Sequence, residues 1–191
     1  KKLISKGGTI VEGTAGNTGI GLAIVCKEYG LNLKIVIPKT QSIEKKDTLR
    51  NLGAELIEVD AVPYSDPKNY IKQSKKIAEE LNKKSSKGVY WANQFDNVIN
   101  AEAHIQTTAE EIWSQTAGNI DGFTCAVGTG GTLAGVSIGL KNKNKDIKIA
   151  LSDPMGSSLY SHIKNNKLES SGNSITEGIG TGRITKNFDK A

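Results

Sequence analysis

Two glycine-rich stretches carry the residues whose types and spacing could bind anions. The second of them, residues 128–132 (GTGGT), follows a short apolar segment and precedes a helical pattern. A loop that ends a strand and opens a helix aims backbone N–H groups and the positive end of the helix dipole at one point, which suits a phosphate. Considered alone, this loop is explained about equally well as an ordinary glycine-rich turn.

The first stretch, residues 13–19 (GTAGNTG), has the same layout with different chemistry. Thr14, Asn17 and Thr18 add two hydroxyls and an amide at the start of an apolar helical pattern, and these groups are good donors for a carboxylate. Helix capping by Asn17 or Thr14 is the alternative that needs no ligand. Capping explains one polar residue well, but it explains three residues clustered with glycines less well.

Nucleotide fingerprints fail at both loops. The dinucleotide pattern G-x-G-x-x-G would need a third glycine where Leu133 stands, and at Gly16 the spacing is G-x-x-G-x-G. The phosphate-binding pattern G-x-x-x-x-G-K-[ST] does not occur. A small ligand with one phosphate and one carboxylate therefore fits the two loops better, and pyridoxal phosphate carrying an amino acid is one such ligand.

Strand and helix patterns alternate along nearly the whole chain. Strands are expected at 9–12, 33–37, 54–59, 89–91, 123–127 and 147–151. The expected helices are the tail of one at 1–6, one ending at Gly30, one capped by Ser42, one starting at Asp66 and Pro67, one from Asn100 to Trp113, and one at 133–140. This order predicts an α/β fold with mainly parallel sheets, in which both loops lie at the carboxyl edge of a sheet.

Composition narrows the class of protein. The 191 residues are 37% hydrophobic with no apolar run long enough to cross a membrane, which predicts a soluble protein without a membrane partner. The net charge is +5, but only two of the 25 basic residues are arginine, so we expect no nucleic-acid partner. Because the chain begins at Lys1 and its only methionine is Met155, we expect an internal fragment of a longer protein.

The cysteines and histidines predict no metal site. Cys26 and Cys125 lie apart in apolar patterns, and His104 and His162 have no ligand spacing around them. Isolated cysteines of this kind favour a reducing compartment, and we expect a cytoplasmic protein.

Five short motifs, in order along the chain, resemble one family. They are 12–19 (EGTAGNTG), 93–95 (NQF), 128–132 (GTGGT), 153–157 (DPMGS) and 177–180 (EGIG). Together they closely resemble the cysteine synthase (O-acetylserine sulfhydrylase) family, which belongs to the fold-type-II, tryptophan-synthase-β-like enzymes that use pyridoxal phosphate. The resemblance runs from about Gly8 to the C-terminus. It implies two doubly wound βαβ domains, incomplete here: residues 1–98 as the smaller, mobile domain that binds the substrate carboxylate, and residues 99–191 as part of the larger domain that binds the cofactor phosphate.

The resemblance also implies roles for matching residues. The phosphate of the cofactor would be held by Gly128, Thr129, Gly130, Gly131 and Thr132. Asn17 would bond the phenolic oxygen of the cofactor and take part in substrate binding. The α-carboxylate of the substrate would be received by Thr14, Ala15, Thr18 and Gln94. Residues 178–182 would line the mouth of the site.

The chemistry implied by the resemblance is a β-replacement, in which O-acetyl-L-serine loses acetate and gains sulfide to give L-cysteine. The amino-acid substrate and sulfide are then the small-molecule partners. The resemblance further implies a homodimer that can bind the C-terminal tail of serine acetyltransferase.

Two departures from the family pattern matter. The Schiff-base lysine of the family precedes the first loop in an Asn-Pro…Ser-x-Lys-Asp motif, which is absent here, and Lys1, Lys2 and Lys6 do not stand in that context. We therefore expect no catalytic lysine in this chain and no catalysis by the chain alone. Ala15 stands where many members have serine, which can alter the carboxylate contacts.

Other functions remain open from the sequence. A cystathionine β-synthase or a serine/threonine dehydratase would share the fold and the cofactor. A truncated paralogue that binds ligands or partners without catalysis belongs to another class, as does a binder of sugar phosphates or nucleotides.

Overall fold

The computed structural model describes residues 3–191 and divides the chain into two compact units, Lys1–Asn93 and Gln94–Ala191. The division falls a few residues before the boundary between 98 and 99 that the sequence suggests, because residues 94–97 are held by the C-terminal unit. None of the helices formed within residues 3–191 is long and apolar enough to cross a membrane.

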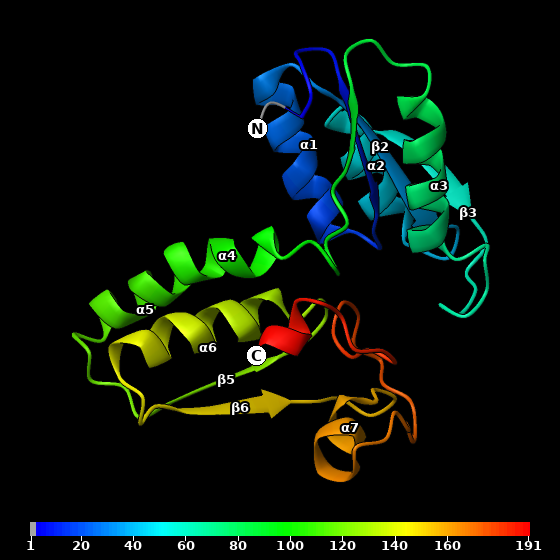
Figure 1. Cartoon of the computed structure of the whole chain (residues 1–191). Helices are drawn as coiled ribbons and strands as arrows, with labels where there is room; N and C mark the ends of the chain where they lie inside the picture. The colour runs from blue at the N-terminus through cyan, green and yellow to red at the C-terminus, as the bar shows by residue number, and fades with distance from the viewer. Residues whose placement is uncertain (1–2) are drawn as a thin grey trace. The chain divides into compact units, whose positions relative to one another are not determined.

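The N-terminal unit is built on a parallel four-stranded sheet (Figure 1). Its strands are β1 (Thr9–Gly13), β2 (Asn32–Pro38), β3 (Glu55–Val59) and β4 (Val89–Trp91), in the order β3-β2-β1-β4. Its helices are α1 (Asn17–Tyr29), α2 (Ile43–Asn51) and α3 (Tyr70–Asn82). The strand edges agree with the sequence patterns to within one or two residues, and the parallel pairing confirms the predicted α/β class.

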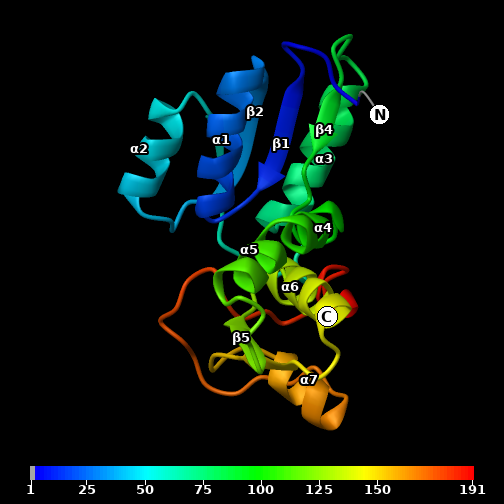
Figure 2. The same ribbon diagram turned by 90° about the vertical axis from the view of Figure 1, so that its left-hand side faces the viewer.

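Apolar side chains cover both faces of this sheet, as the continuous apolar run of β2 predicts. Ile35 and Ile37 point toward α1 and α2, where Cys26 and Leu49 complete one buried cluster. Val36 points to the opposite face, into a second cluster with residues of α3. Figure 2 shows α1 and α2 on one side of the strands and α3 on the other.

Local signals placed two of the helix ends in this unit correctly. Gly30 ends α1 in the left-handed conformation, with φ 62°, and Ser42 caps α2 by accepting a hydrogen bond from the Lys45 N–H at 3.4 Å. The predicted start of the third helix at Asp66 is wrong. Asp66 instead closes a turn by accepting from the Lys68 N–H at 2.7 Å, and α3 begins at Tyr70 with Asn69 as its cap.

The helix tail expected at 1–6 is not formed by Leu3 to Lys6, which lie in an irregular segment and a turn; Lys1 and Lys2 lie outside the described residues. The Ser5 N–H donates to the Lys87 carbonyl at 2.9 Å, and the Gly7 N–H donates to the Gly30 carbonyl at 2.8 Å. Bonds to distant backbone groups hold this segment and replace the helical pattern.

The C-terminal unit packs helices on a parallel pair of strands. The strands are β5 (Gly122–Ala126) and β6 (Lys148–Ser152), and the helices are α4 (Ile99–Gln106), α5 (Thr108–Gln115), α6 (Gly131–Lys143), α7 (Leu159–Asn165) and the short 3-10 turn η1 (Phe188–Lys190). Figure 1 shows α6 between the α4–α5 pair and the two strands. Val136 and Leu140 of α6 are fully buried there, against Ala109 of α5 and Ile147.

The apolar strand expected at 123–127 is only half buried. Phe123 and Cys125 pack into the core formed with α6, whereas Gly122 and Thr124 are exposed, and β6 alternates in the same way. Within the described residues of this unit, packing covers one face of the strand pair, which explains the alternation.

The helix expected from Asn100 to Trp113 is interrupted. Thr107, at φ −120° and ψ −73°, separates α4 from α5. Asn100 is not a cap, since α4 begins one residue before it, and its side chain makes tertiary hydrogen bonds instead.

Candidate functional site

The second loop leads from the carboxyl end of β5 through the buried Val127 into α6. The N-cap of α6 is Gly130, so no side chain blocks the start of the helix, and the first turn contains no acidic residue. Gly130 has φ 89°, and a Cβ built there would lie 2.6 Å from the backbone nitrogen of Phe188. Only glycine fits this position, and the bare helix end keeps its positive dipole available to an anion.

Two threonine hydroxyls of this loop are held by residues of α4. Thr129 Oγ1 accepts hydrogen bonds from the Gly131 N–H at 3.3 Å and from Asn100 Nδ2 at 3.1 Å. Thr132 Oγ1 lies 3.2 Å from His104 Nε2. The sequence predicts a cap at Asn100 and an isolated histidine at His104, but their spacing of four residues on one helix is a signal that both face one neighbour.

A strap formed by residues 178–185 lies against the second loop. The Gly180 N–H donates to the Val127 carbonyl at 2.7 Å, and Thr185 Oγ1 donates to the Thr129 carbonyl at 2.5 Å. Ser157 anchors the strap because its Oγ accepts from the Thr181 N–H at 3.0 Å. The lining role expected for 178–182 stays a prediction, but this contact places the strap at the loop.

Gln94 is fixed through its backbone. Its carbonyl accepts from Asn100 Nδ2 at 2.9 Å and from Asn187 Nδ2 at 3.0 Å. Asn187 is completely buried and also donates to the carbonyls of Phe95 (2.8 Å) and Asn97 (3.2 Å), while its Oδ1 accepts from the Ala101 N–H at 3.3 Å. Asn187, for which the sequence predicts no role, thus holds the Gln94 segment against the C-terminal residues of the unit.

An ion pair also links the segment after Gln94 to the C-terminal residues of the unit. The Asp96 carboxylate receives both guanidinium nitrogens of Arg183, at 3.2 and 3.1 Å, and the Lys186 N–H at 3.0 Å. Burial acts to raise the pKa of Asp96, but the hydrogen bonds from Arg183 and Lys186 outweigh it, so the pKa lies below its usual value. The carboxylate is therefore charged at neutral pH, as a bidentate arginine requires.

The first loop opens α1 in a similar way. The N-cap is Gly16, no side chain caps the helix, and its first turn has no acidic residue, whereas Ser42 and Asn69 cap the other two helices of that unit. Thr14 is buried and its Oγ1 accepts from the Gly16 N–H at 3.2 Å, while Asn17 is exposed. The capping alternative for Asn17 and Thr14 is wrong, because neither side chain closes the helix end.

The predicted site residues divide between the units. Thr14, Ala15, Asn17 and Thr18 belong to the N-terminal unit, and Gln94 belongs to the C-terminal unit with the second loop. A common ligand for the two loops stays a prediction.

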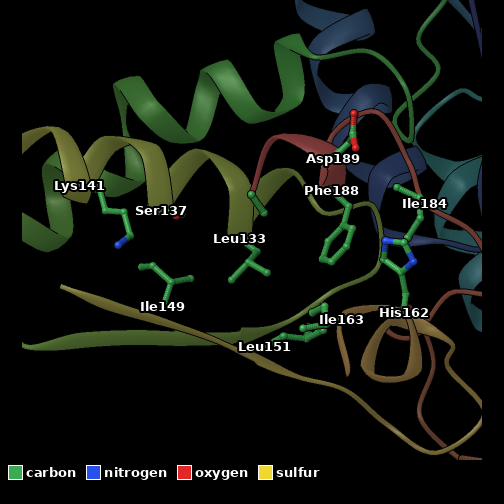
Figure 3. A pocket seen from close by; sticks show the side chains of 11 residues that line it. Leu133, Ser137, Lys141, Ile149, Leu151, His162, Ile163, Ile184, Phe188 and Asp189 are labelled. Atoms are coloured by element: carbon green, nitrogen blue, oxygen red, sulfur yellow. The ribbon is translucent and has the colours of Figure 1, made fainter. Parts of the chain in front are cut away.

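A separate pocket of about 630 Å³ lies beside α6 in the C-terminal unit (Figure 3). Leu133 and Phe188 project into it from α6 and η1, and His162 projects from α7. None of the predicted site residues lines it. Its other lining residues are Ser137, Lys141, Ile149, Leu151, Ile163, Ile184, Asp189 and Ala191.

Comparison with known protein families shows to which family this chain belongs. A model of the family described as pyridoxal-phosphate dependent enzymes matches residues 1–190. The chain belongs to this family. Family membership and the parallel α/β units together bear out the fold and the cofactor that the motifs implied.

Named relatives agree with this assignment. Cysteine synthase 1 of Emericella nidulans is 53% identical over 189 residues, which are 97% of this chain and 50% of the relative. Cysteine synthase of Dictyostelium discoideum is 41% identical over 203 residues and is covered to 52%. The chain spans about half the length of the curated relatives it matches.

Solved structures show the same fold. A hydrogen sulfide-producing enzyme from Fusobacterium nucleatum matches with a TM-score of 0.80 at 37% identity, over 98% of this chain and 59% of that one. The structure of an O-ureido-L-serine synthase matches with a TM-score of 0.79 at 32% identity, over 95% of this chain and 54% of that one.

The second loop fits the phosphate of the family's cofactor. The helix start is capped by a glycine and carries no acidic group, and the Thr129 hydroxyl receives two N–H donors from the protein, which leaves its hydrogen for an acceptor. A phosphate dianion is an acceptor only, so donors of this kind match it.

The two cysteine thiols and the possible metal ligands give no sign of a second reactive site in the described residues. Burial raises the pKa of both thiols, Cys26 and Cys125, so that neither is a thiolate at neutral pH. Among residues 3–191 no group of three or more histidine, cysteine, aspartate or glutamate side chains is placed to hold a metal ion.

Proposed function

We propose that the whole protein to which this chain contributes converts O-acetyl-L-serine and sulfide to L-cysteine and acetate, with pyridoxal phosphate as its cofactor. The proposal is supported chiefly by the second loop, where the helix starts at a glycine without a side-chain cap and the Thr129 hydroxyl, which already accepts two N–H groups, has its hydrogen left for a phosphate. The relatives named cysteine synthase, at up to 53% identity, supply the choice of reaction.

The second loop has the task of holding the cofactor phosphate. Gly128, Gly130 and Gly131 supply backbone N–H groups, and Thr129 and Thr132 supply hydroxyls. The start of α6 adds its dipole, which favours the phosphate dianion over a neutral group.

The first loop has the task of binding the amino-acid substrate. Thr14, Ala15, Asn17 and Thr18 stand at the uncapped start of α1, where N–H groups and the helix dipole favour a carboxylate. Gln94 contributes to the same task, and Asn17 also bonds the phenolic oxygen of the cofactor. In this proposal the N-terminal unit binds the carboxylate and the C-terminal unit binds the cofactor.

The cofactor, when bound, stabilises negative charge at the substrate Cα so that acetate can leave Cβ and sulfide can take its place. The first loop orients the amino acid by its carboxylate, and the second loop orients the cofactor by its phosphate. No residue of this chain is assigned to proton transfer.

Partners and compartment follow from the resemblance. We infer a homodimer in the cytoplasm, where the two thiols remain reduced, and an interaction with the C-terminal tail of serine acetyltransferase. The free state of Cys26 and Cys125 supports the compartment.

An assay of the full-length protein with two substrate pairs tests the reaction. We expect cysteine to form from O-acetylserine and sulfide at a kcat/KM at least about tenfold above that of cystathionine formation from serine and homocysteine. A preference for serine and homocysteine would contradict the proposal in favour of a cystathionine β-synthase. Turnover of neither pair, with ligand binding retained, would favour a non-catalytic paralogue.

A further inference from the structure

Helix α4 packs against the start of α6 with its Asn100 and His104 face. These residues are four apart and therefore project from one side of the helix. The approach is close because α6 presents glycines there: a Cβ at Gly131 would lie 2.2 Å from Asn100 Oδ1, and a Cβ at Gly135 would lie 2.5 Å from His104 Cβ. The side chains of Asn100 and His104 thus contact the second loop from the side of α4.

Asn100 determines which hydrogen bonds Thr129 can still make. Its Nδ2 donates to the Gln94 carbonyl at 2.9 Å and to Thr129 Oγ1 at 3.1 Å. The carbonyl can only accept, so the nitrogen and not the oxygen of the amide must face this way. With the Gly131 N–H at 3.3 Å, Thr129 Oγ1 accepts two hydrogen bonds, which fills both of its lone pairs. The remaining hydrogen can only be donated.

His104 acts on Thr132 in a related way. Its Nδ1 lies 2.9 Å from Thr108 Oγ1 and its Nε2 lies 3.2 Å from Thr132 Oγ1. Burial lowers the pKa of His104, so the ring is neutral at pH 7 and carries one N–H. If that hydrogen is on Nδ1, Thr132 must donate to Nε2 and has no hydrogen left for a ligand. If it is on Nε2, the Thr108 hydroxyl donates to Nδ1 and Thr132 keeps its hydrogen.

We propose that Asn100 and His104 are positioning residues that hold the hydroxyls of Thr129 and Thr132 as donors toward the cofactor phosphate. This proposal rests on the proposed function, in which a phosphate in the second loop accepts from both threonines. Thr132 can donate to the phosphate only when the His104 hydrogen is on Nε2, so binding stabilises that tautomer. In this proposal Asn100 and His104 act through the two threonines and not on the cofactor itself. The chain of bonds runs from Thr108 through His104 to Thr132 and ends at the anion.

Substitutions of His104 in the full-length protein test the proposal. The glutamine amide in His104→Gln can donate where Nε2 donates, whereas His104→Leu fills the space without a donor. We expect His104→Leu to raise the dissociation constant for pyridoxal phosphate, measured by titrating the apoprotein, about tenfold, and His104→Gln to raise it less than about threefold. The KM for O-acetylserine at saturating cofactor should change in neither variant.

Two threonine variants test the hydrogen bond between Thr108 and His104 Nδ1. Thr108→Val removes the hydroxyl proposed to donate to Nδ1, while Thr107→Val removes a neighbouring hydroxyl that donates to the Ala103 carbonyl at 2.7 Å. We expect weaker cofactor binding in Thr108→Val, by about threefold, and no change in Thr107→Val. Equal cofactor affinity in His104→Leu, His104→Gln and the natural protein would overturn the proposal, as would equal losses in the two valine variants.

A measurement on the unaltered protein decides the case if a variant does not fold. The ¹⁵N NMR spectrum of the histidine rings in the cofactor-loaded protein, assigned by correlating each ring with its own backbone resonances, should show hydrogen on Nε2 of His104. Hydrogen on Nδ1 would overturn the proposal. A protein that binds the cofactor with this histidine form and yet does not turn over O-acetylserine would contradict only the proposed reaction.

Discussion

Replacing Asn187 with alanine is expected to lower the free energy of unfolding of the C-terminal unit by about 3 kcal/mol. The side chain is fully buried, its Nδ2 shares two hydrogens among the carbonyls of Gln94, Phe95 and Asn97, and its Oδ1 accepts from the Ala101 N–H. Alanine removes this partner from one buried and three half-buried backbone groups and also leaves a cavity, and both losses destabilise the folded state.

Tryptophan fluorescence can follow this unit during urea unfolding of the chain. The sequence has two tryptophans, one in each unit, so in a Trp91→Phe background Trp113 reports on the C-terminal unit. Asn173→Ala is the matched control, since Asn173 is exposed. If the two alanine variants unfold within about 0.5 kcal/mol of each other, Asn187 does not hold the Gln94 segment as described.

Replacing Gly135 with alanine is expected to destabilise the same unit by about 2 kcal/mol and to weaken cofactor binding. The new Cβ would lie 2.3 Å from the Ala101 carbonyl oxygen and 2.5 Å from His104 Cβ, both in α4. Neither contact is the end of a flexible side chain, so α4 must move away from α6. That shift also displaces His104 from Thr132, which links packing to the phosphate site.

A glycine in α1 provides the control for this substitution. Gly21 also lies within a helix, but a Cβ there would meet nothing within 4 Å. Gly21→Ala should therefore stabilise the N-terminal unit by about 0.5–1 kcal/mol, because alanine favours the helix. Urea unfolding followed by Trp91 and by Trp113 separates the two effects. A stabilising Gly135→Ala would show that α4 and α6 are not in close contact.

The parts of the fold that could be predicted are those with local signals. Ser42 and Gly30 mark helix ends by chemistry that acts within a few residues, and the glycines of both loops mark the turns between strand and helix. The short strands were predicted because β-branched runs need no knowledge of distant partners. Asp66 and Pro67 show the limit, since the same residues serve a turn and a helix start equally well.

The residues that hold the candidate site in place, Asn100 and Asn187, could not be predicted, because their hydrogen-bond partners are distant in the sequence. Asn100 meets Thr129, 29 residues away, and Asn187 meets Gln94, 93 residues away. An asparagine before an apolar periodic segment predicts a cap, and only the packing of α4 on α6 gives Asn100 a different task. The threonines were predicted from their motif, but the direction of their hydrogen bonds depends on these tertiary contacts.

The assignment of the two loops to two ligands is tested most directly by measuring cofactor affinity and substrate KM in a pair of valine variants of the full-length protein. Thr129→Val should raise the dissociation constant for pyridoxal phosphate about tenfold and leave the KM for O-acetylserine at saturating cofactor within about threefold. Thr14→Val should do the reverse. If Thr14→Val weakens the cofactor as much as Thr129→Val does, or if Thr129→Val changes only the KM, the assignment of phosphate to the second loop and carboxylate to the first is contradicted.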